Sequence, residues 1–406
     1  MDNNPVAIYV CPGDPWGAPR GGQTSFARQA LNAFRGKFAV VSPCETGSIP
    51  IGRWIVDDWR GERIWRFNIG SYAPTNKSKL PIIPRRVVFR WLIKKYLPAI
   101  RTIKTRNLFC DSPEILDVLC QYSWESTCYR FAGLNNPITF SRYRHLRFLA
   151  DWFHRRTMKY LSILSPEVCL ASADRMTIAK FEEENAAVIP KGRLKFFPTR
   201  YDNNVFFPGN AQTALRNLGW ENRYPRLSIV GRLCWIKGWL LALEALKIIK
   251  KRFPRVLLSF VGDGEDRAKL ESKVGEFGLS ENVRIEGFLK PEEVCERLVA
   301  SDLYLVASIR EGWSVALVEA LACGKVVVST EVSGTRDMVV DGVNGLVVSK
   351  REPAAFANAI EKALSLVDSQ LSPLPISVEI SNRFSQKTLA EDLANLWTPL
   401  RKGVAL

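Results

Sequence analysis

The chain has 406 residues, more than one hydrophobic core usually supports, so two domains are expected. Its 47% hydrophobic and 24% charged residues are typical of a globular protein and exclude a disordered chain. No apolar stretch reaches the roughly 18 residues that a membrane span requires, and residues 1–5 do not resemble the start of a signal peptide. We therefore expect a cytoplasmic protein.

The net charge of +16 arises mainly from the residues before Gly209. A positive field attracts nucleic acid, anionic lipid and phosphorylated substrates alike, so charge alone does not select a partner. No nucleic-acid-binding motif accompanies the charge, and we expect no specific nucleic-acid partner.

The nine cysteines are scattered, odd in number and never spaced as CxxC. This pattern argues against both a disulfide framework and a zinc site. We expect mostly buried free thiols, no metal site and no cofactor.

The first half alternates short apolar runs with helical patterns, as parallel α/β sheets require. A buried strand (Val6–Val10), a Gly/Pro loop (Pro12–Gly22) and a helix (Gln23–Phe34) open the chain. Further strands are predicted at 38–41, 137–140 and 168–171. The sequence therefore predicts a Rossmann-like domain over residues 1–205.

The segment Phe196–Gly209 is rich in Pro and Asn and has the composition of a linker. After it, strands are predicted at 227–230, 256–261, 283–288, 303–306 and 326–329. They indicate a second doubly wound domain over residues 210–380. A last helix within 384–400 is expected to cross back to the N-terminal domain.

A strand, loop and helix surround the segment from Glu311 to Glu319. A helix that begins near Ser314 would direct its first free N–H groups and positive dipole end at a phosphate. Glu311 lies in the loop and Glu319 in the helix, so the two carboxylates would reach different parts of one ligand. A helix cap and two solvated glutamates are the alternative interpretation.

A Gly turn follows the strand at 227–230 and carries two cations, Arg232 and Lys237. Both residue types stabilise negative charge that develops on a phosphate leaving group. The alternative interpretation is that they are two ordinary surface cations at the end of a strand, without a binding role. A third loop begins at Gly262, where Arg267 occupies the third Gly position of a dinucleotide motif and weakens that interpretation.

In the order and spacing of these elements, the chain resembles the family-4 retaining glycosyltransferases of the GT-B fold. That resemblance implies an α/β protein with two Rossmann-like, doubly wound domains that face each other across a cleft. It also implies a catalytic role for Glu311, Arg232 and Lys237, with Glu311 facing the donor sugar and Glu319 holding the ribose. The further donor-binding residues that it implies are Gly21, Gly22, Gly262, Phe288, Gly312, Trp313, Ser314 and Val315.

The chain departs from that family's pattern in two places. Residues 198–202 read Pro-Thr-Arg-Tyr-Asp instead of the usual Pro-Asn-Gly-x-Asp. Many relatives carry a His after the middle strand of the N-terminal domain, whereas here His145 and His154 follow some residues later, on the next helix. Neither histidine is assigned a catalytic role.

The segment Arg85–Arg106 mixes many cations with Phe89, Trp91 and Tyr96. It could lie on an anionic membrane surface. It could equally be a core helix with a solvated basic face, and Pro98 is expected to interrupt a long helix. The sequence leaves both interpretations open.

The function that these features imply is a retaining, metal-independent hexosyltransferase with a nucleotide-diphosphate sugar as donor. The acceptor would be a glycan or lipid-linked molecule in bacterial-type surface polysaccharide or lipopolysaccharide synthesis, on the inner face of a membrane. The alternatives are a nucleotide-sugar epimerase of the same fold and a non-catalytic accessory protein of a glycan assembly complex.

Overall fold

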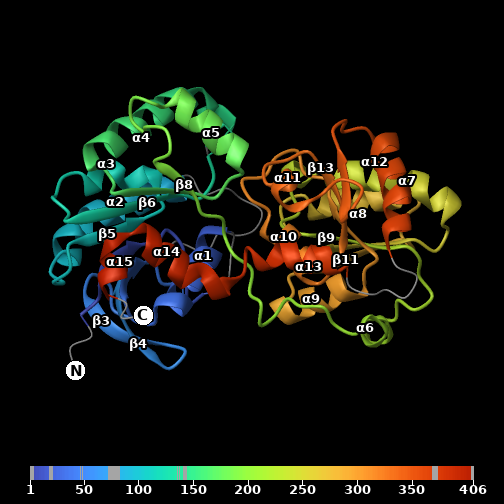
Figure 1. Cartoon of the computed structure of the whole chain (residues 1–406), viewed down its shortest axis with the longest axis horizontal. Helices are drawn as coiled ribbons and strands as arrows, with labels where there is room; N and C mark the ends of the chain where they lie inside the picture. Colours follow the sequence, from blue (N-terminus) through green and yellow to red (C-terminus); the bar gives the residue numbers. More distant parts are fainter. Residues whose placement is uncertain are drawn as a thin grey trace. The chain divides into compact units, whose positions relative to one another are not determined.

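The computed structural model describes residues 4–17, 22–45, 47, 49–71, 83–134, 136, 138–139, 144–367 and 374–403. The chain forms two compact units (Figure 1). Met1–Thr199 together with Gln386–Leu406 form the N-terminal domain, and Arg200–Ser385 form the C-terminal domain. The predicted bounds were 1–205 and 210–380, with the last helix in 384–400.

The described part of the N-terminal domain contains an eight-stranded sheet with the order β3-β4-β2-β1-β5-β6-β7-β8. Neighbouring strands are parallel except β3 and β4, which form an antiparallel hairpin. The central strands are buried on both faces, which explains their continuous apolar sequences. The strands are β1 (Ala7–Val10), β2 (Phe38–Ser42), β3 (Trp54–Trp59), β4 (Glu62–Asn68), β5 (Asn107–Cys110), β6 (Ser126–Phe131), β7 (Val168–Ala171) and β8 (Leu194–Phe196).

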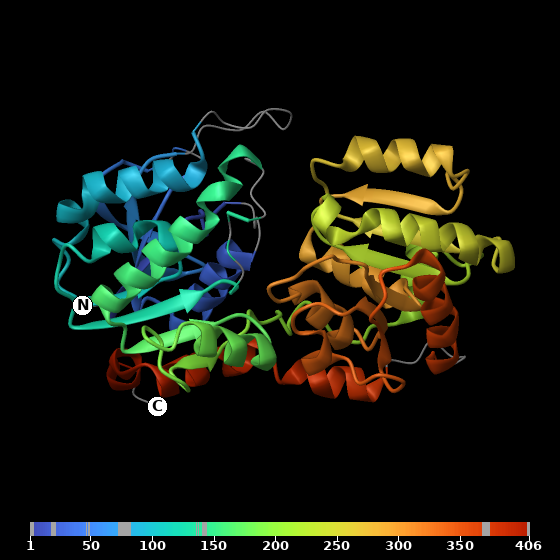
Figure 2. The same cartoon turned by 90° about the horizontal axis from the view of Figure 1, so that it is seen from above.

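Helices cover both faces of this sheet, and each face has its own hydrophobic core. One face carries α2 (Arg85–Ile100), α3 (Leu116–Leu119), α4 (Ala150–Leu164) and α5 (Arg175–Glu184). The other face carries α1 (Gly22–Phe34), α14 (Leu389–Leu396) and α15 (Thr398–Gly403). Figure 2 shows the red C-terminal helices on one side of the sheet and α2 and α4 on the other.

The C-terminal domain is a six-stranded sheet with the order β11-β10-β9-β12-β13-β14, and all neighbouring strands that the structure describes are parallel. Helices α7 and α12 pack together over one face, where the largest core lies, and α10 packs against α13. The strands are β9 (Arg226–Val230), β10 (Leu257–Val261), β11 (Val283–Gly287), β12 (Leu303–Val306), β13 (Val326–Thr330) and β14 (Gly345–Val348). The helices are α6 (Ala211–Leu218), α7 (Trp239–Arg252), α8 (Arg267–Glu276), α9 (Pro291–Ala300), α10 (Val315–Ala322), α11 (Thr335–Met338), α12 (Pro353–Ala363) and α13 (Pro375–Asn382).

Short 3-10 helices lie between these elements. They are η1 (Pro113–Ile115), η2 (Arg144–Leu149), η3 (Trp235–Lys237), η4 (Leu364–Leu366) and η5 (Gln386–Thr388).

Two sequence expectations were wrong. The strand predicted at 137–140 is absent from the described residues there, because Ile138 and Thr139 lie in a turn, and β6 supplies the strand of this region. Pro98 does not interrupt α2, because it lies in the last turn of the helix. The edge strand β14 was not among the strands predicted from the sequence.

Candidate functional site

Three loops converge at one edge of the C-terminal sheet. Because β9, β10 and β12 are parallel neighbours, the loops that follow them begin at the same edge. A Cβ atom on Gly262 would lie 2.0 Å from the Gly231 carbonyl oxygen, and one on Gly238 would lie 1.8 Å from the Ala307 oxygen. Both glycines also have positive φ angles, 136° and 68°. Close backbone approach therefore requires a glycine at position 262.

Lys237 and Glu311 form the central contact of this edge. The Lys237 ammonium donates to Glu311 Oε1 at 2.7 Å, and the Ser308 hydroxyl donates to the same oxygen at 2.6 Å. The Glu311 side chain is 10% exposed and that of Lys237 is 29% exposed. Two donors on one carboxylate oxygen fix its direction, so the site is arranged before any ligand arrives.

Arg232 lies on the loop after β9, beside that contact in sequence. Its side chain is 53% exposed, and its Nε atom is 3.9 Å from Glu265 Oε2. An exposed pair at this distance contributes little to stability. The guanidinium can therefore turn toward a phosphate at small cost.

Helix α10 begins at the same edge, after β12. Ser314 is buried and occupies the N-cap position in an extended conformation, but its side chain makes no capping hydrogen bond. Trp313 is buried, and its ring lies 5.0 Å from the ring of Phe384. The Ser314 side chain therefore caps none of the first N–H groups of α10. The alternative interpretation, in which Ser314 is a simple helix cap, does not fit this geometry.

Glu319 lies in the second turn of α10. Burial, and then the charges of Cys295 and Asp202, raise the pKa of its carboxyl from 4.5 to about 7, although the side chain keeps partial contact with solvent. Within the described part of the chain, no hydrogen bond to this carboxylate is present. The group can therefore accept or donate a hydrogen bond near neutral pH, which suits sugar hydroxyls.

Phe288 directly follows β11, whose carboxyl end lies on the same side of the sheet, and is 71% exposed. The preceding Gly287 accepts a hydrogen bond from the amide of Gly262 at 2.8 Å. The structure thus joins Phe288 to the Gly262 loop. Gly22, by contrast, is the first residue of α1 in the N-terminal domain, and Gly21 lies outside the described residues.

Sequence reasoning missed Ser308 and Arg351. The Arg351 guanidinium donates to the carbonyl oxygens of Ala307 and Ser308 at 2.9 and 2.6 Å and so holds the loop that carries Glu311. A Ser placed two residues after the end of a buried strand was a usable signal for Ser308. Arg351 gave no signal, because its role depends on a fold contact across 43 residues.

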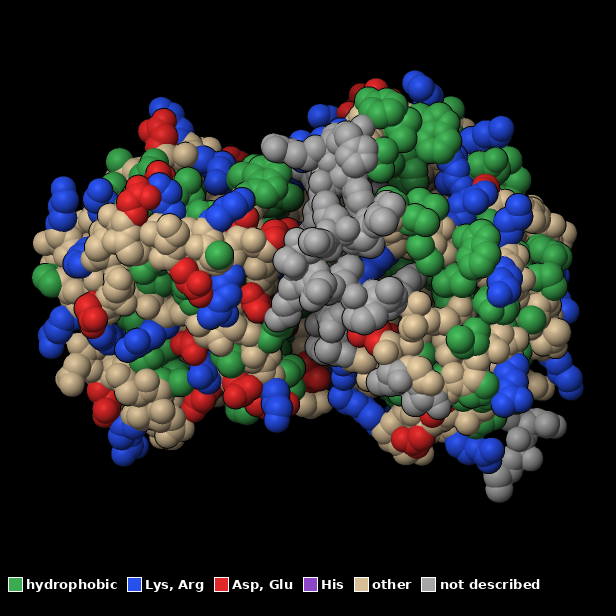
Figure 3. Space-filling model, turned by 180° about the vertical axis from the view of Figure 1, so that it is seen from behind, with side chains coloured by type: hydrophobic (Ala, Val, Ile, Leu, Met, Phe, Trp, Pro, Cys, Tyr) green, Lys and Arg blue, Asp and Glu red, His purple; other side chains and the backbone are tan. Residues whose placement is uncertain are grey.

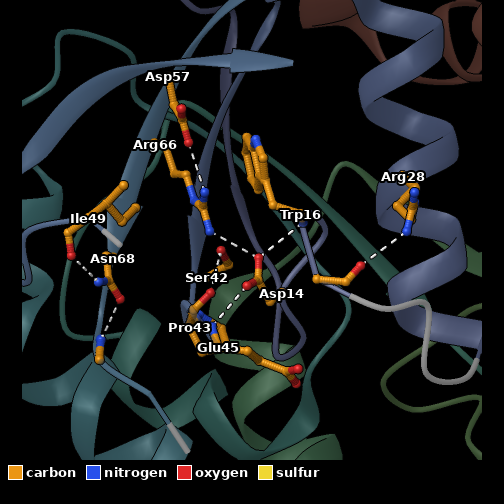
Figure 4. Close-up of polar contacts among 12 residues, drawn as sticks. Asp14, Trp16, Arg28, Ser42, Pro43, Glu45, Ile49, Asp57, Arg66 and Asn68 are labelled. Carbon is orange, nitrogen blue, oxygen red and sulfur yellow. Dashed lines mark hydrogen bonds and ion pairs between the residues drawn. The ribbon is translucent and has the colours of Figure 1, made fainter. Parts of the chain in front are cut away.

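A buried ion pair organises the first loop of the N-terminal domain (Figure 4). Arg66 on β4 contacts Asp14 at 3.0 Å and Asp57 at 2.8 Å, and its guanidinium lies 3.9 Å from the centre of the Trp16 ring. Asp14 also accepts hydrogen bonds from the amides of Trp16 and Glu45. The loop between β1 and α1 therefore has a fixed start, a feature that the sequence analysis did not find.

The described residues contain no group of three or more His, Cys, Asp or Glu side chains that could hold a metal ion. In that same part of the chain, no helix is long and apolar enough to cross a membrane. All nine cysteines are free thiols, and eight of them are buried.

Residues 211–372 match the family described as Glycosyl transferases group 1. The D-inositol 3-phosphate glycosyltransferase of Corynebacterium urealyticum is 30% identical over 220 residues, which cover 52% of this chain and 52% of that protein. The amylovoran biosynthesis glycosyltransferase AmsK of Erwinia amylovora is 30% identical over 179 residues, covering 42% of this chain and 44% of its own. The chain thus spans about half the length of the curated relatives that it matches.

A crystal structure of Anabaena HepE in complex with UDP-glucose matches 96% of this chain and 98% of its own, with a TM-score of 0.69 at 18% identity. This likeness shows that the chain has the GT-B fold, built from two Rossmann-like domains. The segment that matches the family contains Arg232, Lys237, Glu311 and Glu319. The likeness to the glycosyl transferases group 1 thus covers residues 211–372 and includes these four side chains.

Proposed function

We propose that the protein transfers a hexose from a nucleotide-diphosphate sugar to an acceptor hydroxyl with retention of the anomeric configuration. The observation that carries the proposal is the contact of Lys237 and Ser308 with Glu311, beside the start of α10. A cation, an oriented carboxylate and free helix amides at one sheet edge match the charges and hydroxyls of such a donor.

In the proposed step, the bond between the anomeric carbon and the diphosphate oxygen breaks, and its electron pair passes to the diphosphate. Lys237, Arg232 and the first amides of α10 stabilise that charge, so the step requires no metal ion. The acceptor oxygen bonds to the same face of the anomeric carbon, and its proton passes to the departing phosphate oxygen. Glu311 holds the sugar hydroxyls during this exchange, and Glu319 holds the ribose.

The relatives support the choice of donor and setting. HepE was crystallised with UDP-glucose, and AmsK is a glycosyltransferase of amylovoran biosynthesis. In line with this similarity, we propose a role in surface polysaccharide or lipopolysaccharide synthesis, with a glycan or lipid-linked acceptor. Its expected location is the cytoplasmic face of a membrane, to which it would bind peripherally.

Two helices of the N-terminal domain support the membrane location. Val87 and Trp91 on α2 are exposed, as is Ile83 just before this helix. Trp152 on α4 is exposed, as is Phe148 just before that helix. The two helices flank α3, because Arg90 of α2 and Arg156 of α4 both contact Asp117. These exposed apolar side chains, three of them aromatic, therefore lie on helices that cover a single face of the sheet, and we call them the apolar surface.

Exposed cations accompany that surface on the same helices: Lys94, Lys95, Arg155 and Lys159. Among the described residues of α2 and α4, Asp151 is the one exposed acid. Figure 3 shows green and blue side chains with few red ones over this half of the molecule, at the right. Aromatic rings with surrounding cations suit the interface of an anionic bilayer.

The proposed function is tested by measuring the thermal midpoint with UDP-, GDP-, ADP- and dTDP-linked sugars, because a ligand of the native state raises it. We expect one donor to raise the midpoint of the wild type and to be consumed when an acceptor extract is added. Glu311→Ala should lose turnover by at least about a hundredfold and remain folded. Glu276→Ala, an exposed glutamate on α8, should behave as the wild type.

Each other outcome favours a different function. Donor binding without transfer or hydrolysis would favour a non-catalytic accessory protein. Inversion of a centre within the donor sugar, without an acceptor, would favour an epimerase. Full activity of Glu311→Ala would remove this residue from the site and contradict the proposed mechanism.

A further inference from the structure

Two free thiols of the C-terminal domain lie in contact. Cys295 is in the second turn of α9, Cys323 is the C-cap residue of α10, and these two helices pack against each other. The two Sγ atoms are 3.7 Å apart. Since the sulfur atoms of a disulfide are about 2.0 Å apart, an approach of less than about 2 Å would join this pair.

The Cys295 thiol lies directly beneath a surface segment. Its Sγ atom is 4.0 Å from the carbonyl oxygen of Phe207, and the Phe207 side chain is 52% exposed. Cys295 itself is 8% exposed, whereas Cys323 is 1% exposed. A small reagent that enters from solvent therefore meets Cys295 before Cys323.

The surroundings give the two thiols different acidities. A hydrogen bond from the Cys323 thiol, together with the Lys325 charge, lowers the pKa of Cys295 from 9.0 to about 7, although burial opposes this shift. The same contact, and then burial, raise the pKa of Cys323 well above 9.0. Lys325 is buried and fixed, because its ammonium donates to the carbonyl oxygens of Val299 at 3.0 Å and Ser301 at 3.2 Å. Cys295 is therefore the thiolate of the pair, and Cys323 keeps its proton.

We propose that Cys295 and Cys323 form a modification site at which a hydroperoxide is reduced and an intramolecular disulfide is made. First, the Cys295 thiolate attacks a peroxide oxygen, the O–O bond breaks, and the departing oxygen takes up the proton that Cys295 released. Cys295 is then a sulfenic acid. Next, the Cys323 sulfur attacks the Cys295 sulfur, the S–O bond breaks, and the hydroxyl leaves as water with the proton of Cys323. The two thiols lose two electrons, and the peroxide gains them.

The disulfide would lie close to a residue of the candidate donor site. Cys323 follows Glu319 by one helical turn, and its amide donates to the Glu319 carbonyl oxygen at 3.1 Å. After burial, the charge of Cys295 is the largest cause of the raised pKa of the Glu319 carboxyl. A disulfide carries no charge, so oxidation removes this contribution and lowers that pKa. The chemistry of the two thiols does not depend on the proposed function.

The test compares Cys295 with Cys120, the one cysteine that is not buried. Partial burial, and then the charge of Asp117, raise the pKa of Cys120 to about 11. Exposure and acidity therefore predict different reactive thiols. The reduced full-length protein is treated with hydrogen peroxide at neutral pH, the remaining thiols are alkylated, and the peptides are identified by mass spectrometry.

We expect Cys295 and Cys323 to lose alkylation together and at least about tenfold faster than Cys120, because the thiolate is the reacting form. The two cysteines should appear in one pair of linked peptides, which dithiothreitol separates. This measurement uses the wild type and needs no substitution.

Two variants assign the roles of the thiols. Cys323→Ser lacks the second thiol, but the serine hydroxyl can still donate to Cys295, so a sulfenic acid should accumulate at Cys295 and react with dimedone. Cys295→Ser should leave Cys323 reduced. Cys120→Ser is the matched control and should form the disulfide at the wild-type rate. The thermal midpoint of each variant without peroxide shows whether it is folded.

Three results would overturn the proposal. One is a faster loss of alkylation at Cys120 than at Cys295, and another is oxidation of Cys295 to sulfinic or sulfonic acid in the wild type without linked peptides. The third is unchanged alkylation of both thiols in excess peroxide, which would make them small buried side chains of the core. Donor binding is measured separately on the reduced protein, so a failed thiol site is distinguishable from a failed transferase.

Discussion

Glu319 and Asp111 are acids whose ionisation opposes folding. Burial raises the pKa of each carboxyl to about 7, one in each domain. Each folded-state pKa lies above the unfolded value, so between about pH 4 and pH 7 the native state binds more protons than the unfolded state. The contribution of these two carboxyls to stability is therefore largest at the acid end of this window and falls as pH rises.

Glu319→Gln tests this for the C-terminal domain. The amide cannot ionise, so the thermal midpoint of the variant should fall less than that of the wild type between pH 5 and pH 8. The difference at pH 8 should correspond to roughly 2 kcal/mol, less than the full shift because the side chain keeps some solvent contact. Calorimetry at both pH values measures it. Parallel curves for wild type and variant would contradict the raised pKa, and Glu276→Gln should show no effect.

At the residue scale, the sequence indicated side chains that the structure brings into contact, but it did not indicate their protonation states. Glu311 and Lys237 were identified from their spacing around strands and turns, and the structure places them in contact. Ser308, which also donates to Glu311, was not identified from the sequence. The raised pKa of Glu319 depends on burial and on neighbours that are remote in sequence, such as Cys295 and Asp202. Only the fold reveals such neighbours.

The exposed aromatic side chains of α2 and α4 lead to a prediction at the scale of elements. The double variant Trp91→Ser, Trp152→Ser should bind vesicles of phosphatidylcholine with phosphatidylglycerol about tenfold more weakly than the wild type, because it loses two interfacial rings. Sedimentation with the vesicles at two salt concentrations measures this. Added salt should weaken wild-type binding, since Lys94 and Arg155 act through charge.

The control for this experiment is Phe207→Ser, an exposed aromatic residue of the C-terminal domain, which should leave vesicle binding unchanged. Equal binding of the wild type to vesicles of pure phosphatidylcholine would contradict the role of the cations. An equal loss in the Phe207 variant would show that any exposed ring contributes.

Strands with a continuous apolar sequence were predicted correctly, whereas short strands without one were not. The strands β9, β12 and β13 are continuous apolar runs and were found within a residue or so. The edge strand β14 has four residues and follows a polar turn, and it was not predicted. The apolar residues near Ile138 suggested a strand because a short run carries no information on pairing partners.

At the scale of the whole molecule, the C-terminal segment completes the core of the N-terminal domain. Trp397 is fully buried, its ring lies 6.1 Å from Phe109, and its indole nitrogen donates to Ser126 Oγ at 2.7 Å. Trp397→Ala should cost about 3 to 5 kcal/mol, as expected for a cavity of this size. Calorimetry should show a lower transition for the N-terminal domain, while the donor still stabilises the C-terminal one.

A matched control is Trp235→Ala, a half-exposed tryptophan of the C-terminal domain, which should leave the N-terminal transition in place. A single, uniformly lowered transition in Trp397→Ala would instead mean that the two domains unfold together. The sequence indicated two domains and a returning helix, but not that Trp397 is among the largest buried side chains of the chain.

The return of the chain at Gln386 also sets an order of events during synthesis. The ribosome must complete Arg200–Ser385 before the segment that covers α1 has been made. At bacterial or eukaryotic elongation rates this interval is on the order of tens of seconds. Throughout it, the N-terminal sheet exposes the apolar face that Leu393 and Trp397 later cover. The nascent chain therefore keeps this apolar face uncovered until the residues after Ser385 have been made.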